Sequence, residues 1–253
     1  MGTSQKTSEV EKIFRELQEM IVTGELPTGC RLIESQIAEL FGVSRTPTRL
    51  AIERLASIGL VEHTPNRGAI VHQPSFEELK ELLQIRQINE GLTARMAAQK
   101  CREEDAAALY EILDKMRDAL EADDTATYSA LSSRIHLCIM EIAHNRFLTD
   151  FVMRIYMITS RYHMAITSLP YRANSSYLEH RAIVDAIASH DGDAAEQAMV
   201  QHIGIIKNFF SNEHSRIFFP PRESDGKRAM LLRMSASKVE GTKRSSRHRA
   251  SFD

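Results

Sequence analysis

Arg45 and Arg49 are the residues of this chain best suited to reading bases in DNA. They stand four residues apart near the start of a predicted helix, so both project from one helical face. A guanidinium can donate two hydrogen bonds together, to O6 and N7 of guanine in the major groove. Thr46 and Thr48 lie in the same turns, and the hydroxyls of Ser44 and Thr46 suit phosphate oxygens. The alternative is a solvated helix that carries ordinary surface arginines.

His136, His180 and His202 form a second group of residues that could do chemistry. They fall on three different predicted helices in the C-terminal part of the chain. A single helical histidine is more often a polar core or surface residue than a metal ligand. On an earlier helix, Arg86 stands four residues before Glu90 and could either bind an anion or pair with that carboxylate.

The two arginines belong to a segment whose element order is that of a winged helix-turn-helix, within residues 6–73. Apolar residues recur at helical spacing in 10–21, 37–41 and 50–58, and a glycine follows each run. We expect Ser44 to cap the third helix. The buried face of that helix is predicted to consist of Leu50, Ile52, Leu55 and Ile58.

A predicted hairpin follows this helix and would form the wing. Its strands are expected at 60–63 and 69–72. The connecting turn carries Arg67 and Gly68, which would reach a minor groove or a flanking phosphate. A recognition helix followed by a wing predicts that this domain binds double-stranded DNA.

Charge is distributed unevenly along the chain. Residues 1–75 contain 8 Lys and Arg against 9 Asp and Glu, residues 76–215 contain 14 against 21, and residues 216–253 contain 10 against 4. DNA affinity in the N-terminal domain must therefore come from the placement of its arginines.

The sequence shows no segment that would direct the chain to a membrane or out of the cell. No apolar run is long enough to span a membrane, and no leader is visible. The three cysteines are widely spaced, which predicts reduced thiols and no disulfide framework. We expect a cytoplasmic protein.

Residues 27–71 of this predicted DNA-binding segment resemble the GntR family of bacterial transcription regulators. The matching signature is Pro27, Gly29, Arg31, Leu32, Glu34, Ile37, Ala38, Glu39, residues 42–47, Arg49, Leu55, residues 59–61, Arg67 and Gly68. The resemblance implies base contacts by Arg45 and Arg49, minor-groove entry by Gly68 and a place for Arg31 in the DNA interface. Thr48-Arg49-Leu50 stands where the family commonly has Val-Arg-Glu, and the loss of that acidic residue should alter a local helix contact.

The remaining ordered part, residues 75–215, is predicted to be all helical. Ser75 and Glu78 form a capping box that opens the first helix. Helices are expected near 76–100, 103–122, 125–144, 147–168, 174–190 and 193–213. Six helices with short connections predict an antiparallel bundle. Residues 216–253 read as a disordered basic tail, either without a role or weakly attracted to phosphate.

Residues 76–212 resemble the FCD domain that follows the wing in the FadR subfamily, with the six helices of its VanR-like branch. The resemblance rests on residues 86–90, Ile135, His136, residues 143–145, Glu179, His180, Ile183, Asp193 and residues 198–202. It implies a divalent metal, zinc or nickel, held by an Asp and three His. The histidines match His136, His180 and His202, but Ser132 stands where the family has the Asp. A hydroxyl is a poor ligand, so an empty site is the alternative.

Family effectors are mostly small organic acids, which implies a carboxylate bound in the bundle. The candidate effector-binding residues are Arg86, Ser132, Arg134, Asn145 and Arg161. The resulting hypothesis is a homodimeric repressor, because one helix reads only a few base pairs and two half-sites are needed. The alternatives are a metal-dependent hydrolase that uses the three histidines and a DNA-binding protein without an effector.

Overall fold

A computed structural model describes residues 2–64, 68–167 and 172–211, apart from a few side chains in those ranges. These residues form two compact units, residues 2–73 and residues 74–211. The predicted arginine tip at Arg67 and the tail from 216 on lie outside the described residues. All three cysteines are buried and have free thiols. None of the helices in the described ranges is long and apolar enough to cross a membrane.

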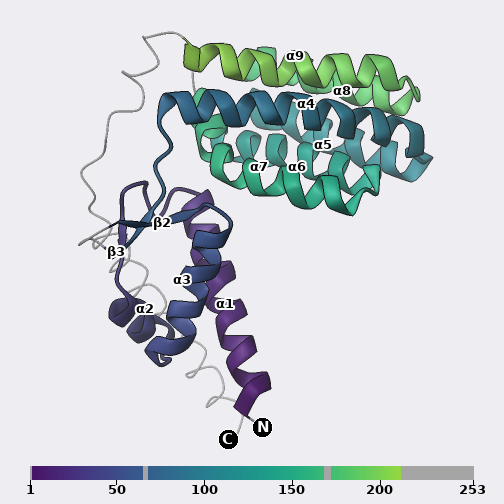
Figure 1. Ribbon diagram of the computed structural model, residues 1–253. Helices are drawn as coiled ribbons and strands as arrows, with labels where there is room; N and C mark the ends of the chain where they lie inside the picture. The colour runs from purple at the N-terminus through teal and green to yellow at the C-terminus, as the bar shows by residue number, and fades with distance from the viewer. Residues whose placement is uncertain (1, 65–67, 168–171, 212–253) are drawn as a thin grey trace, which may run out of the picture. The chain divides into compact units, whose positions relative to one another are not determined.

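The first unit is a winged helix-turn-helix, as predicted (Figure 1). Its elements are α1 (Gly2–Val22), β1 (Arg31–Leu32), α2 (Glu34–Phe41), α3 (Arg45–Ser57), β2 (Val61–Thr64) and β3 (Gly68–Val71). The strands form an antiparallel sheet in the order β1-β3-β2, with Arg31 opposite Ile70 and Thr64 opposite Gly68. Buried apolar side chains of α1 and α3 form part of the core of this unit. They include Ile13, Leu17, Ile52 and Leu55.

Helix α3 begins as predicted but buries a different face. Ser44 is its N-cap residue with an extended backbone, although its side chain makes no capping hydrogen bond. The buried positions are Pro47, Thr48, Ala51, Ile52 and Leu55. Leu50 was predicted to be buried, and that prediction is wrong, because its side chain is 45% exposed. At 3.6 residues per turn, Leu50 lies nearly opposite the buried Ile52 and Leu55 around the helix.

The second unit is a bundle of six helices in the described residues (Figure 1). They are α4 (Phe76–Lys100), α5 (Glu103–Glu121), α6 (Thr125–Ala143), α7 (Arg146–Thr167), α8 (Arg172–Ala188) and α9 (Gly192–Ser211). The predicted all-helical class is confirmed. The predicted capping box is present: Ser75 Oγ accepts from the Glu78 N–H at 3.2 Å, and the Glu78 carboxylate accepts from the Ser75 N–H at 2.8 Å.

Helices α4 and α9 lie side by side at very close range (Figure 1). A Cβ built on Gly91 of α4 would stand 2.6 Å from Cγ2 of Val200 and 3.3 Å from Cγ of Glu196. The absence of a side chain at Gly91 is therefore what lets α9 approach. Gln87 of α4 also contacts α9 through two hydrogen bonds. Its side-chain amide donates to the Val200 carbonyl at 2.9 Å, and its side-chain oxygen accepts from Lys207 at 2.8 Å.

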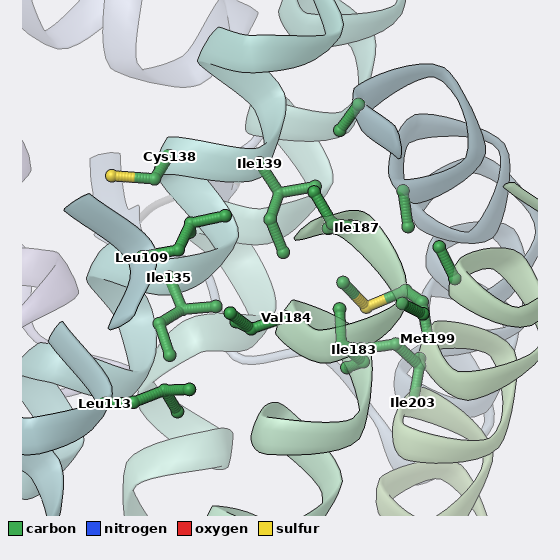
Figure 2. Packing of buried hydrophobic residues seen from close by; sticks show 14 of the residues in the cluster. Leu109, Leu113, Ile135, Cys138, Ile139, Ile183, Val184, Ile187, Met199 and Ile203 are labelled. Carbon is green, nitrogen blue, oxygen red and sulfur yellow. The ribbon is translucent and has the colours of Figure 1, made fainter. Parts of the chain in front are cut away.

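The apolar core of the bundle fixes the positions of its three histidines. Figure 2 shows Ile135 and Ile139 of α6, Ile183 and Val184 of α8, and Met199 and Ile203 of α9 packed together with residues of α5. His136, His180 and His202 are near neighbours of these residues along the same helices. Because close-packed cores admit little movement, the histidines are held by the packing of their own helices.

Candidate functional site

His136, His180 and His202 converge in the interior of the bundle. They come from α6, α8 and α9 and are exposed by no more than 2%. One ligand nitrogen of each lies within 4.8 Å of the other two. The ring centroids are 5.3 Å apart for His136 and His180, 5.3 Å for His136 and His202, and 4.4 Å for His180 and His202. The fold therefore brings together three imidazoles that are 22 to 66 residues apart in sequence.

Each of the three rings is anchored at Nδ1 by an oxygen acceptor. Nδ1 of His136 lies 2.8 Å from Oε2 of Glu90, and Nδ1 of His202 lies 2.7 Å from Oε2 of Glu179. Nδ1 of His180 lies 2.7 Å from the carbonyl oxygen of Ser176. These acceptors assign the proton to Nδ1 and leave Nε2 of each neutral ring as the ligand atom.

The Nε2 side of the cluster contains Ser132 instead of a carboxylate. Oγ of Ser132 lies 3.3 Å from Nε2 of His180, which in turn lies 3.4 Å from Nε2 of His136. Burial is the largest cause that lowers the pKa of His180, to about 3. His180 is therefore a neutral imidazole at physiological pH, the form that binds a metal.

One buried ion pair and one partly buried ion pair lie behind the histidines. Arg86 donates through Nε to Glu90, donates through Nη1 to the Thr159 hydroxyl at 2.9 Å, and stands 4.8 Å above the ring of Tyr156. Burial opposes ionisation of Glu90, but the charge of Arg86 and the hydrogen bonds from His136 and Arg86 outweigh it and lower the pKa of Glu90 to about 2. Of the two roles considered for Arg86, the described contacts are those of pairing with Glu90.

Glu179 is held in a similar way by Arg172. The two guanidinium nitrogens of Arg172 lie 2.9 Å from the two carboxylate oxygens of Glu179. Burial raises the pKa of Glu179, and Arg172 opposes that rise. Glu90 and Glu179 thus supply negative charge to the outer nitrogens of His136 and His202.

This donor set fits zinc or nickel. Three neutral imidazoles with carboxylates on their outer nitrogens form a common metal-binding arrangement, and the carboxylates increase the basicity of the ligands. Because Ser132 stands in place of an acid, that position adds no negative charge to the ligand side of the cluster. The remaining positions of a metal would be left to water or to a bound anion.

The other predicted effector residues are not all at this site. Ser132 lies in the histidine cluster, beside Nε2 of His180. Arg134 does not lie there, because it is half exposed and pairs with Glu141 at 3.1 Å. Asn145 is not part of the cluster either, since its oxygen accepts from the Leu148 N–H at 3.1 Å at the start of α7 and its amide faces the sulfur of Met96. Their predicted role in effector binding stays a prediction, and the side chain of Arg161 lies outside the described residues.

The sequence did not predict several contacts that hold the histidine rings. Glu179 and Ser176 hold histidine rings, and Glu90 holds His136 in addition to Arg86. The local spacing of Ser176 and His180, four residues on one helix, was a usable signal. The pairing of Glu90 with His136 spans 46 residues and leaves no trace in the sequence pattern.

The predicted DNA-contacting residues of the first unit are mostly exposed. Ser44, Arg45, Thr46 and Arg49 are all exposed. Arg49 is held loosely, with its Nε 3.7 Å from Glu53. Thr48 was predicted to contact DNA, and its position contradicts that prediction. Its side chain is fully buried, and its hydroxyl donates to the Ser44 carbonyl at 3.3 Å.

The wing is also consistent with its predicted role at the residues that are described. Gly68 is exposed and has φ of +76°, a backbone conformation that favours glycine. A Cβ built there would lie 3.9 Å from Nε and Nη2 of the exposed Arg31. Arg31 and Gly68 are therefore close to each other on the surface of the winged unit.

The fold and these surfaces define a DNA-binding transcription regulator with a helical second domain. The family model for bacterial regulatory proteins of the gntR family matches residues 9–71, and that for the FCD domain matches residues 81–204. The chain belongs to the GntR family. This is a family of regulators and not of enzymes, so the hydrolase alternative is set aside.

Two relatives and one solved structure illustrate the similarity. A "Probable D-xylose utilization operon transcriptional repressor" of Paenarthrobacter nicotinovorans is 30% identical over 185 residues, covering 72% of this chain and 80% of that protein. The "HTH-type transcriptional repressor RspR" of Escherichia coli (strain K12) is 30% identical over 195 residues, covering 76% and 85%. The structure of E. coli McbR/YncC shares the fold with a TM-score of 0.71 at 20% identity, over 81% of this chain and 98% of that one.

Proposed function

We propose that this regulator is a homodimeric repressor that leaves its operator when a small organic acid binds at the histidine cluster. The observation that carries the proposal is the cluster itself: three buried imidazoles, each anchored at Nδ1, with one ligand nitrogen of each within 4.8 Å of the other two. Nothing in the packing of a helical core requires such a group. Two relatives at 30% identity are named as repressors.

A zinc or nickel ion held by His136, His180 and His202 would supply a positive charge to which a carboxylate binds. The chain's own residues prepare that place. Glu90 and Glu179 orient the rings, and Ser132 offers a hydroxyl beside His180 that can donate to a bound anion. The surrounding core excludes water, which strengthens each of these interactions.

Helix α4 connects the cluster to the DNA-binding unit through the chain. Its side chains Arg86 and Glu90 contact the site, and its first turn at Ser75 follows the wing by only a few residues. A ligand that displaces α4 therefore acts on the segment that precedes it. Two DNA-binding units in a dimer would then change their spacing, and operator affinity would fall.

The sensing part of the proposal is tested by replacing the three histidines with Ala. Metal analysis of the purified full chain should find up to one zinc or nickel per wild-type chain and none in the variant. A panel of small carboxylates should raise the melting temperature of the wild type only, and a carboxylate that does so should also weaken its operator binding. The matched control is His144→Asn, an exposed histidine in a left-handed conformation that Asn tolerates. A wild type that is free of metal and indifferent to every acid would refute the proposal.

The DNA-reading part is tested by Arg45→Ala and Arg49→Ala. Each should weaken specific operator binding by about 1–3 kcal/mol, because a bidentate contact to guanine is lost. The control is Arg15→Ala, an exposed arginine of α1 that pairs with Glu11. Footprints unchanged by both substitutions would remove these arginines from the interface, whatever the bundle binds.

A further inference from the structure

Leu50 is an exposed apolar side chain on the helix that should read DNA. It is 45% exposed, and among the described side chains of the winged unit it is the one large hydrophobic group that is exposed. An exposed leucine is ordinary on a protein surface. The position of Leu50 on α3, the predicted base-reading helix, is what suggests a role in DNA recognition.

The exposed positions of α3 lie on one side of the helix. Arg45, Thr46, Arg49, Leu50 and Glu53 are exposed, and Thr48, Ala51, Ile52 and Leu55 on the other side are buried. Leu50 follows Thr46 by four residues, so the two side chains are neighbours along the helix. It is the sixth residue of α3, one turn and a half from the helix start. A residue there lies within the part of a recognition helix that enters the major groove.

The major groove offers only one apolar group to such a side chain. Guanine, cytosine and adenine present donors and acceptors, whereas thymine presents a C5-methyl group beside its O4 acceptor. A leucine placed against the polar edges would remove water from them without replacing its hydrogen bonds. A leucine placed against the methyl group buries apolar surface on both sides.

We propose that Leu50 is a specificity-determining residue that contacts a thymine methyl group in each operator half-site. The proposal rests on α3 acting as the base-reading helix. Leu50 then selects thymine over cytosine at one position, while Arg45 and Arg49 select guanine at others. The departure from the family's usual acidic residue at this position thereby gives the chain a different half-site.

The experiment removes the methyl group and nothing else. Operator DNA is selected from a random-sequence library with the full-length protein, and each thymine is replaced in turn by uracil, which lacks the C5-methyl group. For the wild type, one thymine per half-site should respond with a loss of affinity of about fourfold, the value for one buried methyl-sized group. In Leu50→Ala the same replacement should have no effect.

Two controls make the result specific. Leu178→Ala removes a leucine that is 63% exposed on α8 and should keep the full response to uracil. Arg45→Ala tests base reading by α3 separately, so its failure to weaken binding is distinguishable from a failure at Leu50. The proposal is overturned if no thymine of the selected operator responds, or if the responding thymine does so equally in Leu50→Ala.

Discussion

Glu90→Gln should destabilise the helical bundle by about 3 kcal/mol or more. Glu90 and Arg86 are exposed by 2% and 1%, and Glu90 uses separate oxygens for Arg86 and for His136. An amide has only one oxygen, so one of these donors would face an NH2 group. Arg86 would keep the Thr159 hydroxyl and the face of Tyr156. Those neutral groups do not replace a carboxylate, and removing one partner of a buried pair typically costs about 3–5 kcal/mol.

The pH dependence of this loss follows from the pKa of Glu90. Its folded-state pKa is lowered to about 2 from an ordinary value of 4.5. The carboxylate therefore contributes its full stabilisation above pH 4.5 and loses it as the pH falls toward 2. The difference between wild type and Glu90→Gln should be constant near neutral pH and should shrink below pH 4.5.

Urea unfolding followed by circular dichroism at several pH values measures this difference. Glu141→Gln is the matched control, because it breaks the exposed pair with Arg134 and should cost less than about 1 kcal/mol. The double variant Arg86→Met with Glu90→Leu should recover much of the loss, since no charge is then left buried. If Glu90→Gln unfolds like Glu141→Gln, Arg86 does not depend on Glu90 and the argument for a buried network is wrong.

Two further predictions concern helix packing and protonation. Gly91→Ala should lower the stability of the bundle by about 1–3 kcal/mol, because the new methyl group would lie 2.6 Å from Cγ2 of Val200. Adding Val200→Ala in the same chain should recover part of this loss. An unchanged melting temperature of Gly91→Ala would show that α4 and α9 are not in such close contact. In chelator-treated protein, stability should fall by about 1.4 kcal/mol per pH unit as the pH drops below 6.5, because His180, with a folded-state pKa of about 3, takes up a proton only on unfolding. His180→Gln should lack that slope, and an equal slope in both proteins would contradict the neutral, buried state of His180.

Local patterns were sufficient for the elements that position both sites. The capping box at Ser75 and Glu78 set the start of α4, and apolar residues at helical spacing indicated the other five helices of the bundle. The error at Leu50 arose within such a pattern. Leucine fits a buried position by type, but the buried face of α3 includes Thr48 instead, whose buried hydroxyl donates to the backbone of its own helix. Residue type likewise did not show that Arg134 and Asn145 have local partners away from the histidine cluster.

The sequence by itself determined the winged helix, the all-helical second domain and the family, because caps, periodicity and the GntR signature are local properties of the chain. Only the tertiary structure decided that His136, His180 and His202 meet, and that Glu90 and Glu179 stand behind two of them. Those contacts join residues of different helices and depend on how close packing sets each helix against the next. Gly91 illustrates the reason: one missing side chain lets α9, which carries His202, lie against α4, which carries Glu90.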